Sequence, residues 1–289
     1  ENRQLRLERM FAQAAGEEDI SRRDECIKHF NLGGNRRQAI TYPQPVHYRN
    51  SEGAWEEIDN TLEEEITPRG RRILRNKSNR VKMEFPQEAD GGSMASISCD
   101  GQTFSWRFEQ AMQPVSALRR SGAELKQARL ADRAQKLARY AGRTLASLQS
   151  ANLSVELETA QEQRMALPML RSENRYNEVL PGVSLRYELA GEALKEDIIL
   201  SDREALSRAA IRLPASFEYA VTEQQELQIM DKNSGELLFI MNTPLVYDAN
   251  GDETGAAVRL TPCATYTRME YVIDDDFLAS AAWPVTIDP

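Results

Sequence analysis

The segment CIKH, residues 26–29, has the Cys-x-x-His spacing of half a structural zinc site. Such a site needs four ligands. The others would have to come from His47, Cys99, Cys263 or carboxylates, and none of these is paired at ligand spacing. The spacing therefore favours a partly buried thiol at Cys26 beside a surface histidine at His29, and we predict no metal site.

Residues 248–253, DANGDE, gather carboxylates and an amide around a glycine, as calcium-binding loops do. An EF-type loop follows D-x-[DN]-x-[DN]-G and ends on a bidentate glutamate. Here Gly251 comes fourth in the segment, so the template fails. A calcium site completed in space by DDD at 274–276 is the alternative, but the segment favours a solvated hairpin tip.

Two acidic segments offer paired carboxylates for glycoside hydrolysis, EEID at 56–59 and KED at 195–197. This chemistry needs two carboxyl groups roughly 5–10 Å apart across a cleft. Because the chain has 45 acidic residues, closeness in sequence carries little weight. We expect these charges to point outward or cap turns, and Lys195 to pair with a neighbouring carboxylate.

Other catalytic patterns are missing from the sequence. Two histidines leave almost no material for a His-based triad or a His-rich metal site. There is no Gly-rich phosphate loop, Ser-based elbow or Walker pattern. We therefore predict a non-enzymatic protein with no catalytic residues and no cofactor.

Several aromatic residues could form a platform for a sugar ring. In strands of alternating pattern such residues more often belong to the core, which is the interpretation we favour. They are Trp55, Trp106, Trp283, Tyr48, Tyr187 and Tyr247.

Residues 116–150 form a basic, helix-prone segment without proline. Its net charge is +6 in a chain whose net charge is −9. The apolar positions that form one stripe on a helix are Ala123, Leu130, Ala134, Leu137, Ala141, Leu145 and Leu148. The segment either packs by this stripe on an acidic β body or binds a partner protein. The candidate partner-binding residues are Arg119, Lys126, Arg129, Arg133, Lys136, Tyr140 and Arg143.

The elements that must position these residues are mainly strands. Apolar residues alternate through ITYPQPVHYRN at 40–50 and ASISCDGQTFSWRF at 95–108, where Asp100-Gly101 marks a hairpin. The same pattern returns after about residue 153. We predict a mainly β fold of two packed β-sandwich-like units, with an N-terminal helix and a helical insertion. The expected regions are 1–25 (helix), 26–113 (first β unit), 114–150 (helical insertion) and 151–289 (second β unit).

Composition narrows the possible partners. The 289 residues carry 36 basic and 45 acidic side chains, a balance that argues against general nucleic-acid binding. Three cysteines allow at most one intramolecular disulfide. The sequence has no run of 18 apolar residues, so we expect no direct membrane insertion.

Four segments in order resemble the N-terminal region of large secreted or wall-associated proteins of Gram-positive bacteria, which carry DNRLRE-type β modules and often RHS/YD repeats. They are YPQPVHYRNSEGAWEEIDNTL (42–62), NKSNRVKMEFP (76–86), YNEVLPGVSLRYELAGEALKEDIIL (176–200) and WPVTIDP (283–289). The resemblance spans about 40–289. The sequence departs from the family at Leu180 and Ser184, where Phe and Asp are usual, so it supports no role for a carboxylate at position 184.

The resemblance implies an extracellular or cell-wall location and further β modules after Pro289; it transfers no catalytic residue. The expected function is that of a non-enzymatic structural or binding module of a secreted or cell-surface protein. Two alternatives remain open. One is a surface protein that binds a host protein, for example an immunoglobulin, and the other is a carbohydrate-binding module.

Overall fold

The computed structural model describes residues 17–129, 131 and 167–289. Its architecture is mainly β, with 55% strand and 10% helix, as the alternating sequence pattern predicts. The largest element is a sheet of 14 strands that is nearly closed into a barrel.

The N-terminal part forms two small sheets. These contain β1 (Glu17–Glu18), β2 (Ile27–Asn31) and β3 (Arg37–Thr41), then β4 (His47–Arg49) and β5 (Trp55–Glu57), with the 3-10 helix η1 (Ile20–Arg22) after β1. The next strands are β6 (Asp59–Ile66), β7 (Arg72–Ser78), β8 (Lys82–Pro86), β9 (Glu88–Ala89), β10 (Ala95–Cys99), β11 (Gln102–Phe108), β12 (Val115–Ser116) and β13 (Leu118–Ser121).

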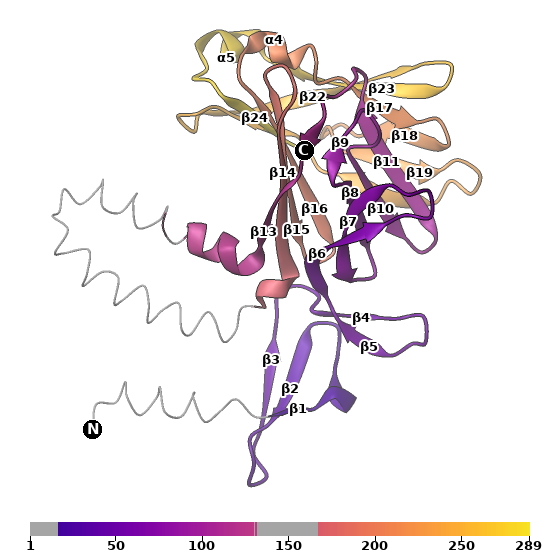
Figure 1. The fold of residues 1–289 in the computed structure, drawn as a ribbon, viewed down its shortest axis with the longest axis vertical. Helices are drawn as coiled ribbons and strands as arrows, with labels where there is room; N and C mark the ends of the chain where they lie inside the picture. The colour runs from indigo at the N-terminus through magenta and orange to yellow at the C-terminus, as the bar shows by residue number, and fades with distance from the viewer. Residues whose placement is uncertain (1–16, 130, 132–166) are drawn as a thin grey trace, which may run out of the picture.

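The C-terminal part begins with the 3-10 helix η2 (Pro168–Leu170). Its strands are β14 (Arg171–Leu180), β15 (Val183–Ala190), β16 (Ala193–Leu200), β17 (Ile211–Pro214), β18 (Phe217–Val221), β19 (Leu227–Asp231), β20 (Leu237–Met241), β21 (Leu245–Tyr247), β22 (Glu253–Pro262), β23 (Tyr266–Ile273) and β24 (Val285–Asp288). Its helices are α4 (Arg203–Leu206) and α5 (Asp275–Ser280). In Figure 1, α4 and α5 lie at the top of the large sheet and β1–β5 extend below it.

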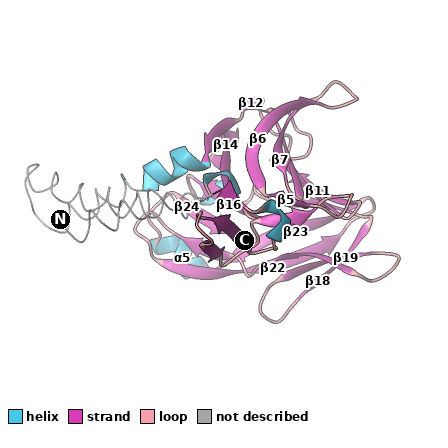
Figure 2. Ribbon diagram, turned by 90° about the horizontal axis from the view of Figure 1, so that it is seen from below, coloured by secondary structure: helices cyan, strands magenta, loops and turns pink. Residues whose placement is uncertain are grey.

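The large sheet joins both halves of the chain. Its order is β13-β14-β15-β16-β24-β21-β22-β23-β17-β11-β10-β8-β7-β6. Phe108 of β11 lies opposite Ile211 of β17 in an antiparallel register, so strands from the two expected β units share one continuous sheet. Seen from below, the sheet curves round between its two ends (Figure 2).

Side chains bridge the gap between the two ends of the sheet, where β6 lies along β13 and β14. The Arg119 guanidinium donates to Glu64 Oε1 at 2.7 Å. The Ser172 hydroxyl donates to the Asn60 carbonyl at 2.5 Å. The barrel is therefore completed here by side-chain hydrogen bonds instead of a backbone ladder.

The hairpin predicted at Asp100-Gly101 is confirmed. Cys99 pairs with Gln102, and the two turn residues have φ of +49° and +83°. Positive φ at both central positions is the type I′ geometry that continues the twist of the flanking strands, and Asp-Gly adopts it readily.

The helical insertion differs in extent from the expected 114–150. Residues 115–116 and 118–121 are strands, because β12 pairs with β9 and β13 pairs with β14. The chain is helical at 122–129 and 131, and the rest of the segment lies outside the described residues. Of the helical region expected at 1–25, residues 1–16 also lie outside them, and Glu17–Glu18 form a strand followed by the 3-10 helix Ile20–Arg22. Ser121 and Glu124 form a capping box at the start of this helix: the Ser121 N–H donates to Glu124 at 2.7 Å.

The three-stranded sheet β18-β19-β20 packs by aromatic contacts on strand β11, which carries Phe104 and Trp106. The Phe104 ring lies 5.5 Å from that of Phe217 and 6.0 Å from that of Phe239. It also stacks on Trp106 at 5.6 Å. This packing places the short sheet over one part of the barrel wall.

Candidate functional site

The cysteines and histidines do not come together. All three cysteines are free and partly buried, as expected for Cys26. His29 is half-buried on β2, whereas His47 is fully buried with its Nδ1 2.6 Å from the Asp24 carbonyl. No cluster of three or more His, Cys, Asp or Glu side chains suited to a metal ion occurs within the described residues.

The acidic turn at 248–253 is held by its first residue. The buried Asp248 carboxylate accepts hydrogen bonds from the backbone N–H groups of Ala282 (2.7 Å), Asn250 (2.8 Å) and Asp252 (3.0 Å). These bonds, that from Ala282 first, lower the pKa of Asp248. In the second acidic run, Asp274 caps the N-terminus of α5. In both segments a carboxylate therefore accepts backbone hydrogen bonds and holds the local chain conformation. The exposed residues Asn250–Asp252 form the predicted hairpin tip.

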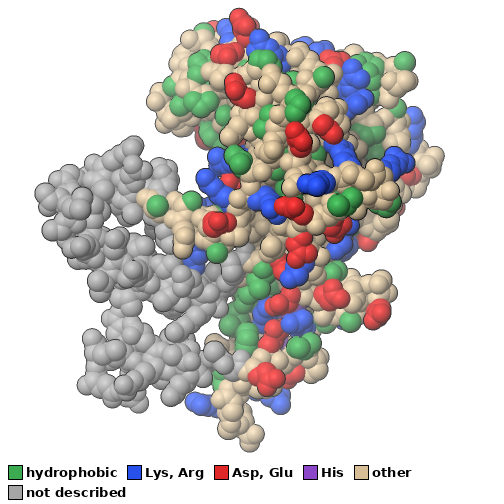
Figure 3. All heavy atoms as spheres, viewed as in Figure 1, with side chains coloured by type: hydrophobic (Ala, Val, Ile, Leu, Met, Phe, Trp, Pro, Cys, Tyr) green, Lys and Arg blue, Asp and Glu red, His purple; other side chains and the backbone are tan. Residues whose placement is uncertain are grey.

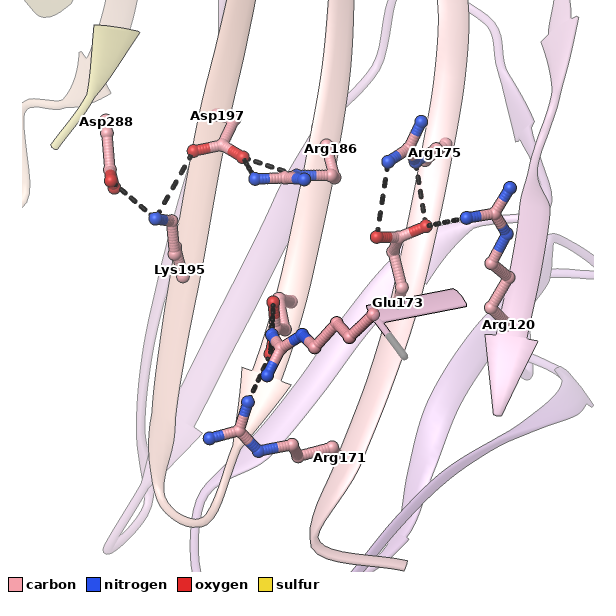
Figure 4. Close-up of polar contacts among 10 residues, drawn as sticks. Arg120, Arg171, Glu173, Arg175, Arg186, Lys195, Asp197 and Asp288 are labelled. Atoms are coloured by element: carbon pink, nitrogen blue, oxygen red, sulfur yellow. Dashed lines mark hydrogen bonds and ion pairs between the residues drawn. The ribbon is translucent and has the colours of Figure 1, made fainter. Parts of the chain in front are cut away.

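Lys195 pairs with neighbouring carboxylates, as predicted. Its ammonium lies 2.5 Å from Asp288 Oδ2 and 3.8 Å from Asp197 Oδ1, and Asp197 also pairs with Arg186 (Figure 4). Burial alone would lower the pKa of Lys195, but the hydrogen bond to Asp288 and the charge of Asp197 raise it. The four side chains form a chain of alternating charge across β15, β16 and β24.

Two more buried carboxylates on the same face are neutralised in the same way. Glu173 pairs with Arg175 at 2.7 Å and with Arg120 at 3.7 Å. Glu188 pairs with Arg129 at 2.7 Å and with Arg171 at 2.9 Å. Basic and acidic side chains are also interspersed over the described part of the face shown in Figure 3.

The candidate partner-binding residues fall into two groups. Arg119 is on strand β13, where it bridges to Glu64, and Arg129 projects from the helical segment to Glu188. Lys126 is half-buried in that segment. The remaining four, Arg133, Lys136, Tyr140 and Arg143, lie outside the described residues. Two of the predicted residues therefore stabilise contacts within the chain.

A network of buried amides links three of the four recognisable sequence segments. The Asn60 side chain donates to the carbonyls of Leu170 (2.9 Å) and Gly191 (2.7 Å). Its oxygen accepts from Asn76 at 3.1 Å and from Asn79 at 2.9 Å. All three asparagines are fully or almost fully buried, so the network joins β6, β7 and the β15–β16 turn inside the protein.

Glu196 does not point outward, contrary to the expectation for the KED segment. Strand β16 alternates, so Lys195 and Asp197 lie on the outer face while Glu196 lies on the inner face with Ile198. Its Oε1 accepts a hydrogen bond from the Trp106 indole at 2.9 Å. The buried Tyr187 hydroxyl lies beside the same carboxyl and interacts with it.

Glu196 borders a cavity of ≈ 120 Å³ between the barrel wall and the β18-β19-β20 sheet. Apart from Glu196, Trp106 and Asn242 its lining is apolar: Ile97, Phe104, Leu194, Leu213, Leu227, Ile229, Phe239, Ile240, Met241, Met269 and Pro289. Burial raises the pKa of Glu196, an effect that the neighbouring Tyr187 and the indole N–H offset only in part. A mostly apolar lining with a few polar groups is typical of small-molecule sites, although such sites are usually larger than this cavity.

Four of the six aromatic residues follow the interpretation favoured from sequence, because Trp106 and Tyr187 lie in the core while Tyr48 and Trp283 pack against it. Trp106 and Tyr187 are buried, and Trp55, Trp283, Tyr48 and Tyr247 are partly buried. Trp55 lies beneath the Arg49 guanidinium, whose carbon is 4.0 Å from the ring centroid.

None of the helices in the described residues is long and apolar enough to span a bilayer. No protein-family model, curated protein or solved structure matches this chain.

Proposed function

We propose that the chain is a non-enzymatic structural and binding module of a large secreted or cell-surface bacterial protein, with its location drawn from the sequence resemblance. One observation carries this proposal: polar residues from all four recognisable segments bond to one another inside the chain. Lys195 joins Asp197 to Asp288, Arg186 completes that chain, and Asn60 joins the remaining segments. Side chains that bond within the chain in this way stabilise the fold, which is the role expected of a structural module.

The chemistry of these contacts supports a scaffold role. Carboxylates that take part in general acid–base catalysis must be free to exchange a proton with a substrate. Asp197 is instead held between Arg186 and Lys195, and Glu56 accepts hydrogen bonds from Tyr48 and Asn50. Both segments considered for glycoside hydrolysis thus contribute carboxylates to internal contacts.

A binding screen tests the proposal and its alternatives. The folded chain is tested against immunoglobulins, host glycoproteins and a glycan panel, and for turnover of nitrophenyl glycosides. We expect binding without turnover. Turnover that is lost in Asp197→Asn or Glu196→Gln would overturn the non-enzymatic assignment.

Charge-matched variants locate the binding surface. The triple variant R133Q/K136Q/R143Q removes three candidate partner-binding charges outside the described residues. R36Q/R37Q/R69Q removes three exposed arginines from the N-terminal half and serves as the control. Loss of a host protein in the first variant alone supports recognition through the basic segment. Loss of host-protein binding in both variants indicates general charge attraction, and such binding should weaken as the salt concentration rises.

A further inference from the structure

Glu196 is the exception among the buried acidic residues in the described ranges. Glu173, Glu188 and Asp197 pair with arginine or lysine, and Asp248 accepts three backbone hydrogen bonds. The polar neighbours of Glu196 are uncharged, namely the Trp106 indole that donates to it and the Tyr187 hydroxyl, and no cationic side chain of the described structure pairs with it. A carboxylate without a counter-charge is expensive to bury.

The buried carboxyl without a counter-charge belongs to a residue that lines the cavity. Glu196 and Trp106 line the cavity together with side chains of the β18-β19-β20 sheet, among them Leu227, Ile229 and Phe239. Ile240, which is 53% exposed, and the exposed Asn242 lie at the solvent side of the lining. The buried Phe104, Leu213 and Met269 form its interior. A small molecule can therefore approach beside β20 and reach the carboxyl.

We propose that this cavity binds a compact apolar amine, whose ammonium group pairs with Glu196 and whose hydrocarbon part contacts Phe104, Trp106 and Met269. The ammonium would supply the counter-charge that the other buried carboxylates obtain from arginine or lysine. The volume sets the size of the ligand, since an apolar cavity of roughly 150 Å³ holds one benzene ring. The volume of ≈ 120 Å³ is smaller, so the ligand has at most one ring and extends in part past the exposed Ile240 towards solvent.

The test uses three probes of similar shape: benzylamine, benzyl alcohol and toluene. Binding is followed through the Trp106 indole N–H resonance in ¹H–¹⁵N spectra, assigned with Trp106→Phe, because this group donates directly to Glu196. We expect benzylamine to bind at least about tenfold more tightly than benzyl alcohol, as a buried charge pair contributes more than a neutral hydrogen bond.

Two variants and one control separate ligand recognition from folding. Glu196→Gln retains an oxygen to accept from Trp106 and should lose the tenfold preference for the amine. Ile240→Trp, at the exposed edge, should block all probes without altering the interior. Glu218→Gln makes the same charge change on the exposed face of β18 and should bind like the unaltered chain.

Acidification should weaken amine binding and leave alcohol binding unchanged, because protonation of Glu196 removes the counter-charge. The proposal is overturned if the folded chain binds none of the probes. It is also overturned if Glu196→Gln, folded by circular dichroism, retains the amine preference. Should Glu196→Gln fail to fold, equal binding of benzylamine by Ile240→Trp and the unaltered chain would refute the assigned cavity.

Discussion

Replacing Asn60 by alanine should destabilise the protein more than any other single amide substitution in the network. The Asn60 side chain takes part in four hydrogen bonds, to Leu170, Gly191, Asn76 and Asn79. The Asn60 amide therefore donates two hydrogen bonds and accepts two, and the side chain is fully buried.

The magnitude follows from these contacts. A buried hydrogen bond contributes about 1 kcal/mol net, so four of them give about 4 kcal/mol. Each partner keeps one bond, because Leu170 O still accepts from Gly191 N, Asn76 still donates to Val81 O, and Asn79 still donates to Gly191 O. One amide N–H of Asn76 and one of Asn79 lose their acceptor. We therefore expect a loss of about 3–5 kcal/mol in the free energy of unfolding, which includes the small cavity left behind.

Aspartate at this position tests the geometry further. Asn60→Asp places a carboxylate oxygen where the amide nitrogen now lies 2.7 Å from the Gly191 carbonyl and 2.9 Å from the Leu170 carbonyl. Two acceptors would then face each other in a buried site. We expect Asn60→Asp to be less stable than Asn60→Ala, although it is the closer match in shape.

Urea unfolding followed by tryptophan fluorescence measures both changes, with Asn233→Ala in an exposed turn as the control. The control should change the free energy of unfolding by less than about 0.5 kcal/mol. In the double variant N60A/N79A, the loss should fall short of the sum of the single losses by about 1 kcal/mol, because the two residues share a hydrogen bond. A loss below about 1 kcal/mol for Asn60→Ala would refute the assignment of the network as a structural joint.

Two further predictions concern charge. Burial lowers the pKa of His47 below its ordinary 6.5, so the folded state holds it neutral while the unfolded state gains a proton. Stability should fall as the pH drops below ~6.5 towards the folded pKa, by at most about 1.4 kcal/mol per pH unit from this group. Thermal unfolding at several pH values should show a shallower slope for His47→Gln, and an unchanged slope would contradict this. Lys195→Met should cost about 1–2 kcal/mol in urea unfolding, since it removes the ammonium between Asp197 and Asp288 from a partly exposed position. In a D288N background the same change should cost less, and equal costs would show that the two residues are not coupled.

The sequence predicts local features of this fold better than its long-range pairing. Alternation and the Asp100-Gly101 turn are properties of neighbouring residues, and both the mainly β class and that hairpin are confirmed. The pairing of β11 with β17 joins residues about a hundred positions apart, and no local pattern encodes it. The sequence pattern therefore predicts two packed β units but does not show that strands of both contribute to one continuous sheet.

Strand β13 shows how tertiary context overrides propensity. Residues 118–121, LRRS, belong to a segment of good helix propensity, but they pair along β14 because that strand needs a neighbour at the end of the sheet. A local signal for the true helix start was present: Ser121 followed by Glu124 is the capping-box spacing.

The orientation of Glu196 was also readable from the sequence. In LKEDIIL, period-two alternation puts Glu196 on the same face as Leu194, Ile198 and Leu200, opposite Lys195 and Asp197. Its partner was not readable, because Trp106 lies 90 residues earlier and reaches it only through the folded barrel. The cavity depends likewise on the packing of the β18-β19-β20 sheet, which the pattern of a single strand cannot reveal.

The contrast between the two faces of β16 bears on function. Lys195 and Asp197 on the outer face are neutralised by neighbours, so their charges are consistent with a stable scaffold. Glu196 on the inner face has no such neutralisation among the described residues, and a glutamine or methionine there would avoid the cost of burying an acid. Sequences depart from the least costly choice mainly where a site requires it. The same short motif thus combines a structural ion-pair chain with the carboxyl that we assign to ligand binding.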